Sequence, residues 1–216
     1  QGFNFFYGYL DQTAAHDFYP EFLFRNAEAE RLPGNVNSGK KNVSSEKVTY
    51  AHTRITEEAL AFVKRNHDKT FYLNLTWNVP HTNNEAGRVE GDGQEIPDYG
   101  IYAKEDWPNP EKGFAAMITL MDHDVGQLLD LLKELKIDQR TLVVFTSDNG
   151  PHQEGGHKME FFNSNGDLQG YKRSLHDGGI RVPMIAWWPG KVEPGVSDHV
   201  SAFWDWLPTA CELAGT

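Results

Sequence analysis

The chain contains 216 residues, of which 39% are hydrophobic and 12% aromatic, and 31 acidic residues outnumber 20 basic ones to give a formal net charge of −11. This length and composition suit one domain with a sizeable core and exclude a disordered protein. The acidic excess argues against a nucleic-acid partner, which requires a basic surface, and no apolar run reaches the roughly 18 residues of a membrane span.

The first half of the chain predicts one helix and one strand between polar loops. Residues 1–50 are rich in Gly, Asn, Ser and aromatic residues, which indicates loops with short ordered pieces. Apolar residues recur at helical spacing over 53–66, whereas 71–76 alternate as a strand does and end at Trp77–His81. The polar excursion over 82–110 is long enough to be exposed or functional rather than core.

The second half predicts two more strands and two more helices. Residues 111–135 form a long amphipathic helix, and 142–146 form an apolar strand that leads into a second polar loop at 150–180. A third strand is expected at 183–188 and a closing helix at 205–213. Strands that alternate with helices predict an α/β fold with a mixed, mainly parallel sheet flanked by helices.

Two oxygen-bearing side chains follow the apolar strand 142–146. Asp148 offers a carboxylate and Asn149 an amide carbonyl, and oxygen ligands suit a hard cation such as Ca²⁺ or Mg²⁺. In open α/β sheets, ligands bind beyond the carboxyl ends of the strands, where this pair would lie. The alternative is an ordinary turn, because Asp-Asn-Gly is also a strong turn sequence.

Two further residues have either an ordinary structural role or a functional one. Lys172 lies among glycines, and a loop lysine is usually solvated. With a metal at Asp148 and Asn149, however, its ammonium would complete a pocket for a tetrahedral anion. His81 follows a predicted strand and Pro80, so it is either a structural histidine or a ligand-contacting group at the end of that strand.

In their order and spacing, these segments resemble the sulfatase family, within the alkaline-phosphatase-like superfamily. The resemblance covers nearly the whole chain, and it rests on several motifs together because each alone is weak. It implies that residues 1–216 form a partial sulfatase catalytic domain with the sulfatase fold. The motifs are Gly2–Tyr9, Val79–His81, Phe145–Gly150, Gly170–Pro183, Trp187–Gly190, Asp205–Thr209 and Leu213–Gly215.

The resemblance implies roles for four residues. It makes Asp148 and Asn149 ligands of one Ca²⁺ ion, with two further acidic ligands outside this chain. It places Lys172 on the sulfate group and His81 near the leaving oxygen, where a protonated imidazole would stabilise developing charge. The two-metal phosphatases that resemble this fold carry His where this chain has Asn149, so the amide oxygen favours the one-metal sulfatase branch.

The loop after the metal pair carries His152, Glu154 and His157. A second metal site at the two histidines is disfavoured, because a coil holds no fixed ligand geometry. Contact with the organic part of the substrate is expected instead, with His152 as the candidate substrate-binding residue. Tyr171 departs from the family pattern, which commonly has glycine immediately before the residue that corresponds to Lys172.

The nucleophile of the family has no counterpart among these residues. Sulfatases form formylglycine from Cys or Ser in a Cys/Ser-x-Pro-x-Arg sequence, which the chain lacks. The single cysteine, Cys211, is expected in the core on the apolar side of the closing helix, and it allows no internal disulfide. The N-terminus has neither Met nor a signal sequence. We therefore expect a fragment without the N-terminal nucleophile segment and the C-terminal subdomain.

The favoured interpretation is hydrolysis of sulfate esters, including those of carbohydrates, by a longer Ca²⁺-dependent sulfatase of which this fragment alone is inactive. One alternative is a phosphoester or phosphonate monoester hydrolase of the same superfamily, which the missing nucleophile segment would distinguish. The other alternative is a non-catalytic fragment that retains the scaffold. The resemblance implies a periplasmic, extracellular or lysosomal location, whereas the sequence itself identifies neither compartment nor natural substrate.

Overall fold

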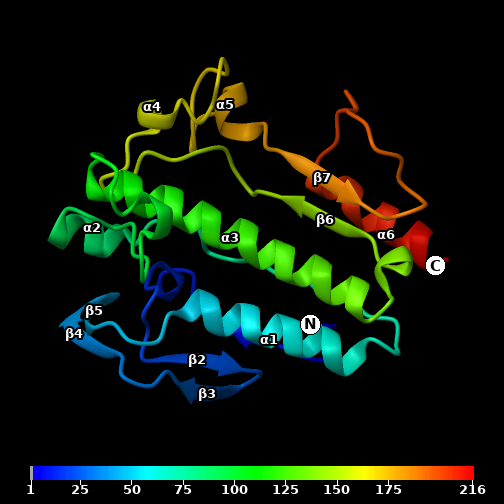
Figure 1. Ribbon diagram of the computed structural model, residues 1–216, viewed down its shortest axis with the longest axis horizontal. Coiled ribbons are helices and arrows are strands. Elements are labelled where there is room, and N and C mark those ends of the chain that lie inside the picture. Colours follow the sequence, from blue (N-terminus) through cyan, green and yellow to red (C-terminus); the bar gives the residue numbers. More distant parts are fainter. Residues whose placement is uncertain (1) are drawn as a thin grey trace.

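The computed structural model describes residues 2–216 and is a mixed α/β structure. Two long helices, α1 (Ala51–Asn66) and α3 (Asn109–Glu134), contact each other between the short N-terminal strands and the pair β6 and β7 (Figure 1). Both long helices confirm the predicted periodicities. The other helices are α2 (Asn84–Glu90), α4 (Met159–Phe162), α5 (Asp177–Ile180) and α6 (Trp206–Ala214), with single 3-10 turns at Ala14–His16, Gly100–Tyr102, Asp138–Arg140 and Phe203–Asp205.

The strands of the described residues form three small antiparallel sheets. β6 (Val143–Thr146) pairs with β7 (Met184–Trp187), so that the carboxyl end of β6 lies beside the start of β7. The mainly parallel part of the expected sheet is therefore not seen among these pairs and stays a prediction. The first sheet has the order β1 (Tyr7–Gly8), β2 (Phe22–Arg25) and β3 (Glu28–Arg31), and the second pairs β4 (Val36–Lys40) with β5 (Val43–Glu46).

The core lies between the helices and the strands on either side of them. Leu131 and Leu132 of α3 form one buried cluster with Val63 of α1 and with Ile137. One residue from each of β6 and β7 packs against this cluster. Complete burial of one such leucine stabilises the fold by about 1.5–3 kcal/mol, so this contact fixes the β6–β7 pair on the helices.

The predicted strand at 71–76 is wrong as a hydrogen-bonded strand. Its side chains alternate as expected, because Phe71, Leu73 and Leu75 are half-buried whereas those between them are exposed. The segment nevertheless has no ladder partner among residues 2–216. The alternation of apolar residues therefore indicated an extended backbone with one covered face. A β-strand also requires a neighbouring segment that hydrogen-bonds to it.

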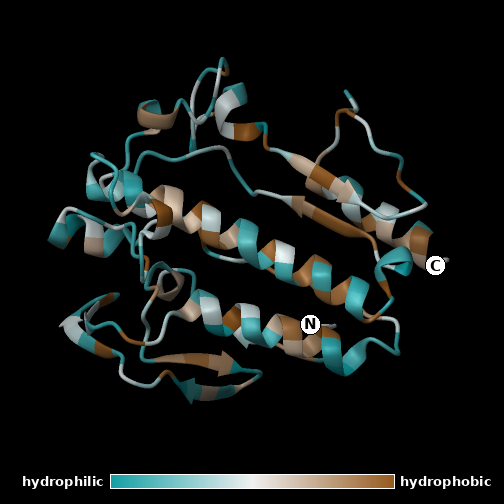
Figure 2. Ribbon diagram, viewed as in Figure 1, coloured by the Kyte–Doolittle hydropathy of each residue, from teal (hydrophilic) through white to brown (hydrophobic). Residues whose placement is uncertain are grey.

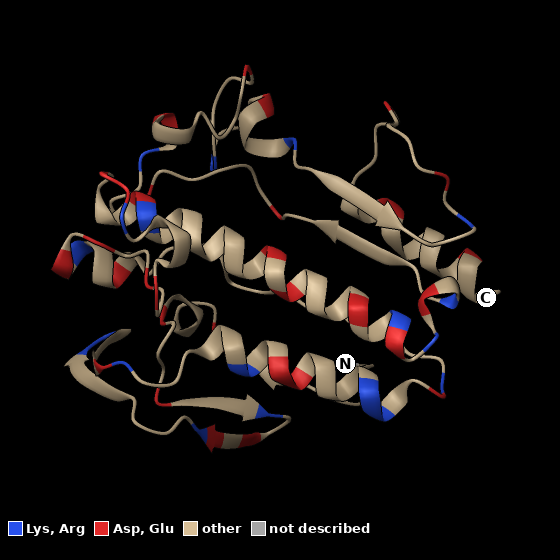
Figure 3. Ribbon diagram, viewed as in Figure 1, with Lys and Arg blue, Asp and Glu red and all other residues tan. Residues whose placement is uncertain are grey.

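The position of Cys211 also differs from the prediction. The predicted closing helix is present as α6, but none of its residues is buried and Cys211 is only partly covered. The cysteine is thus not part of a core, and the element that packs most closely against α6 among residues 2–216 is the 3-10 turn before it. Hydrophobic residues on β7 and α6 remain exposed, and the β6–β7 pair carries no charged residue (Figures 2 and 3).

Among the described residues, no helix combines the length and apolar character that crossing a membrane requires.

Candidate active site

Asp148 and Asn149 lie together immediately beyond the carboxyl end of β6. The Asn149 amide donates to a carboxylate oxygen of Asp148 over 2.6 Å, and Ser147 Oγ donates to the Asn149 carbonyl over 3.0 Å. Asp148 is exposed and Asn149 is half-buried. The pair thus stands at an accessible edge of the β6–β7 sheet, with the two side chains in contact.

Closely packed glycines join this turn to the loop that carries Lys172. The Gly150 N–H donates to the Gly179 carbonyl over 3.0 Å, and the Lys172 N–H donates to the Pro151 carbonyl over 2.8 Å. A Cβ added at Gly150 would lie 1.9 Å from the Gly178 carbonyl oxygen, so only glycine allows this approach. The glycines that surround Lys172 in the sequence therefore hold its backbone against the residues that follow Asp148 and Asn149.

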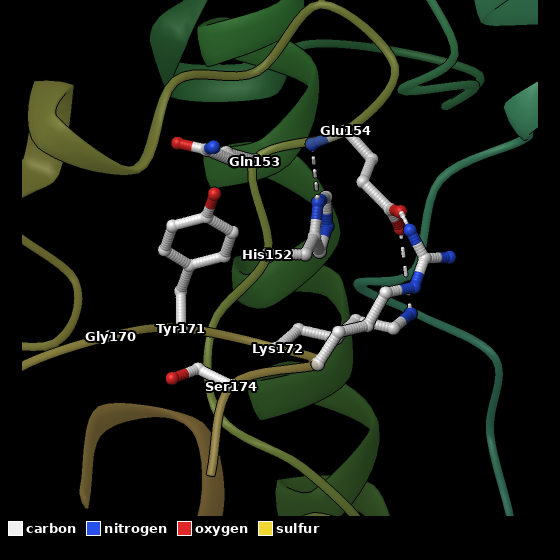
Figure 4. A pocket seen from close by; sticks show the side chains of 8 residues that line it. His152, Gln153, Glu154, Gly170, Tyr171, Lys172 and Ser174 are labelled. Carbon is white, nitrogen blue, oxygen red and sulfur yellow. Dashed lines mark hydrogen bonds and ion pairs between the residues drawn. The ribbon is translucent and has the colours of Figure 1, made fainter. Parts of the chain in front are cut away.

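Lys172 lines a pocket of about 470 Å³, formed by residues 152–154 and 170–174. Its ammonium lies 3.5 Å from the Glu154 carboxylate, and Arg173 contacts the other oxygen of the same carboxylate. Figure 4 shows the Tyr171 ring and the Glu154 carboxylate on different sides of the space around His152. Neither Asp148 nor Asn149 is among the lining residues of this pocket, nor is His81.

His81 is half-buried, and the charge of Lys172 acts on its ring. Its Nδ1 lies 2.7 Å from the Thr82 carbonyl, and because a carbonyl only accepts, this nitrogen carries the proton. Its ring stacks on His16 with centroids 5.1 Å apart. Burial lowers the pKa of His81, and the positive charge of Lys172 lowers it further. In the neutral ring, Nε2 is therefore the unprotonated nitrogen and has no proton to donate.

His152 has both ring nitrogens occupied by the backbone. Nε2 donates to the Pro80 carbonyl over 3.0 Å, and Nδ1 accepts the Glu154 N–H at 3.1 Å. The residue is buried, and burial is the main cause that lowers its pKa from 6.5 to about 4. The ring lines the pocket but has no free nitrogen with which to hydrogen-bond a ligand.

His157 lies in the interior of the protein. Its side chain is fully buried, its Nδ1 lies 2.5 Å from a Glu111 carboxylate oxygen, and its ring stacks on Phe114 at 3.9 Å between centroids. The expected contact with the organic part of a substrate is therefore wrong for this residue. Its acidic partner Glu111 on α3 holds the ring in the interior instead.

The low pKa of His152 makes the folded state sensitive to acid. Between about pH 4 and pH 6.5 the unfolded state binds one more proton at this residue, so stability is lost as pH falls through that window. Urea unfolding of the complete protein is expected to show a steeper loss from pH 7 to pH 4.5 than unfolding of His152→Gln, whose baseline stability is lower. Substitution of exposed His123 by Gln is the control, and equal slopes for all three proteins would contradict the assignment.

Two groups near the pocket were not predicted from the sequence. His16 stacks on His81 while its Nδ1 lies 2.9 Å from Glu85, and nothing in the sequence marks this contact across the fold. Arg173 directly follows Lys172 and pairs with Glu154, and the adjacent basic residues were the available signal.

The donor set at Asp148 and Asn149 suits a hard cation but is incomplete by itself. Carboxylate and amide oxygens are typical Ca²⁺ ligands, and Ca²⁺ takes roughly 6–8 oxygens in total. Among residues 2–216, no group of three or more His, Cys, Asp or Glu side chains is arranged to hold a metal. The chain therefore offers two adjacent oxygen donors, and further ligands would have to come from water or from other residues.

Comparison with known proteins gives a consistent result. A model of the Sulfatase family matches residues 1–216. The chain is 29% identical over 216 residues to the uncharacterized sulfatase YdeN of Escherichia coli K12, 31% over 195 residues to N-acetylgalactosamine-6-sulfatase of Canis lupus familiaris, and 36% over 165 residues to human steryl-sulfatase. These matches cover 99%, 86% and 75% of this chain but 33%, 31% and 26% of those proteins, so the chain spans about a third of their length or less.

A solved structure is similar over most of the chain. The crystal structure of Ps i-CgsB in complex with k-i-k-neocarrahexaose has a TM-score of 0.70 and 28% sequence identity. The match covers 90% of this chain and 37% of that one.

Proposed function

Because this chain belongs to the sulfatase family, we propose that it supplies Lys172 and His81 to an active site that hydrolyses sulfate esters. The observation that carries the proposal is the place of Lys172, which lines a pocket together with His152 and is tied through Pro151 to the Asp148–Asn149 turn. The ring of His81 lies beside that of His152, with centroids 6.2 Å apart, and burial together with the charge of Lys172 lowers the pKa of His81. We further propose that residues 1–216 are part of the catalytic domain. The nucleophile would come from elsewhere in the protein, because these residues contain no Cys/Ser-x-Pro-x-Arg sequence.

In this proposal, Lys172 stabilises negative charge on the sulfate group. Its ammonium is largely shielded from water, which strengthens its attraction for an anion. A bound ester places negative charge near His81 and opposes the lowering of its pKa by Lys172. His81 then takes a proton at Nε2, since Nδ1 is held by Thr82, and donates it to the leaving oxygen.

Asp148 and Asn149 would hold the divalent cation, for which Ca²⁺ fits the two oxygen donors. When bound, such a cation supplies positive charge that polarises the sulfate oxygens. The turn also positions Lys172. Backbone hydrogen bonds of Gly150 and Pro151 hold the loop that carries Lys172 close to the end of β6.

The substrate class that we propose is a sulfated carbohydrate. The pocket volume falls within the range of about 300–1,000 Å³ that is common for small-ligand sites. The relatives include an N-acetylgalactosamine-6-sulfatase, and the similar solved structure contains a neocarrahexaose. The Tyr171 ring offers an apolar face for a sugar, and His152 would contribute ring contact rather than a hydrogen bond.

The activity can be tested on the complete protein with Ca²⁺. We expect release of sulfate from an aryl sulfate and from sulfated oligosaccharides, with kcat/KM higher than for the matched aryl phosphate and aryl phosphonate esters. A preference for a phosphonate or phosphate ester would instead support the alternative hydrolase activity. Failure of every ester with a correctly folded, nucleophile-bearing protein would refute the proposal.

Substitution of Asp148 by Asn tests the metal site. The change keeps the size of the side chain but removes one negative charge from the ligand set, and Ca²⁺ affinity depends on ligand charge. We expect the Ca²⁺ concentration for half-maximal activity to rise by at least about 10–100-fold, the range that supporting residues of metal sites alone produce. Asp122→Asn, at an exposed position on α3, is the matched control. An unchanged Ca²⁺ requirement in Asp148→Asn would exclude Asp148 as a ligand.

A further inference from the structure

The Glu154 carboxylate lies between two cations of the pocket. One oxygen lies 3.5 Å from the ammonium of Lys172, and the other contacts the guanidinium of Arg173. The side chains of Glu154 and Lys172 are only 17% and 16% exposed, whereas that of Arg173 is 69% exposed. Because water and salt screen exposed pairs, the Glu154–Lys172 contact is weakened less than an ordinary surface ion pair.

The backbone holds both partners of this ion pair in place. The Glu154 N–H donates to His152 Nδ1 over 3.1 Å, and its carbonyl accepts from Gln94 Nε2 at 3.0 Å. The Lys172 N–H donates to the Pro151 carbonyl over 2.8 Å. The carboxylate and the ammonium are therefore brought together by fixed segments rather than by two long side chains that meet in solvent.

The charges of Glu154, Lys172 and Arg173 act differently on the sulfate ester and on free sulfate. Lys172 and Arg173 contribute two positive charges, and Glu154 contributes one negative charge. An anion that binds the Lys172 ammonium therefore competes with the Glu154 carboxylate for it. A sulfate monoester carries one negative charge, whereas free sulfate carries two. Repulsion from Glu154 is therefore larger for the product than for the substrate. The same charge also acts on His81, whose pKa it raises.

We propose that Glu154 is a positioning residue and the internal counter-anion of the site. It holds the ammonium of Lys172 in place before the substrate arrives, and it competes with sulfate for that ammonium after hydrolysis. By this competition it limits the affinity for the product and favours product release. The inference rests on the proposed role of Lys172 as the cation that binds sulfate.

Two substitutions in the complete protein should change sulfate affinity in opposite directions. Glu154→Gln keeps the shape but removes the competing charge, so isothermal titration with inorganic sulfate is expected to show binding about 10-fold tighter. Arg173→Gln removes the cation that shares the charge of Glu154, which leaves Lys172 more strongly paired, so sulfate should bind several-fold more weakly. Glu160→Gln, at an exposed position in the nearby helix α4, is the matched control and should bind sulfate as the unmodified protein does.

Kinetics separate this role from a structural one. In Glu154→Gln we expect a lower KM together with a lower kcat, because product leaves more slowly and Lys172 is less well held. A merely structural role would weaken sulfate binding and raise KM, and that result, or an unchanged affinity for sulfate, would overturn the inference. Those outcomes leave the proposed function intact if Lys172→Ala still abolishes sulfate binding. If the unmodified protein neither binds sulfate nor hydrolyses a sulfate ester, the proposed function itself fails.

Discussion

Replacement of Lys172 by Ala in the complete protein is expected to lower kcat/KM for sulfate esters by about 10²–10³-fold, the loss typical for removal of one group that stabilises transition-state charge. The ammonium lies in a largely covered position at the pocket, where its charge is poorly screened. Water that enters the vacated space cannot replace a fixed positive charge. Steady-state kinetics with an aryl sulfate measure the effect, and Lys172→Arg should restore part of the activity because it keeps the charge but changes its geometry.

Two observations distinguish this effect from general damage. Lys191→Ala removes the same charge at an exposed position and should leave kcat/KM unchanged. Loss of Lys172 should also raise the pKa of His81, because the lysine charge is one of the causes that lower it. NMR titration of the His81 ring measures that shift. Full activity in Lys172→Ala, or a pKa of His81 that does not move, would contradict the assignment.

Helices were the part of the fold that sequence periodicity predicted well. The spacing of apolar residues over 53–66 and 111–135 reports one buried face, and the structure buries those faces in α1 and α3. The segment 71–76 was not predictable in the same way. Alternation describes which side chains are covered, but a strand also depends on a neighbouring segment that sequence periodicity does not reveal.

The candidate site was predictable only in part. The turn at Asp148 and Asn149 was placed correctly at the end of β6, because an abrupt change from apolar to polar residues marks a strand end. The Lys172–Glu154 pair depends on how two glycine-rich loops approach each other, which is a property of backbone packing. The burial of His157 was also not predictable, because its partner Glu111 lies on a helix distant in sequence.

The contact between Glu111 and His157 anchors the loop that shapes the pocket. Glu111 lies in the first turn of α3, where a negative charge also interacts favourably with the helix dipole. One of its oxygens lies 2.5 Å from His157 Nδ1, and the other accepts the Lys158 N–H at 2.9 Å. These contacts lie in the interior, since Glu111 and His157 are both buried.

Substitution of Glu111 by Ala is therefore expected to destabilise the complete protein by about 3–5 kcal/mol, the usual cost when one partner of a buried pair is removed. The change leaves the His157 nitrogen and the Lys158 N–H without an acceptor in a site that excludes water. Glu111→Gln keeps the size and one acceptor, so its loss should be smaller. Urea unfolding measures both changes, and Glu134→Ala, at the exposed far end of α3, should stay within about 0.5 kcal/mol of the unmodified protein. Because Glu154 lies on the anchored loop, hydrogen exchange across 150–158 should also become faster in Glu111→Ala, whereas unchanged exchange and stability would show that the contact does not hold the pocket.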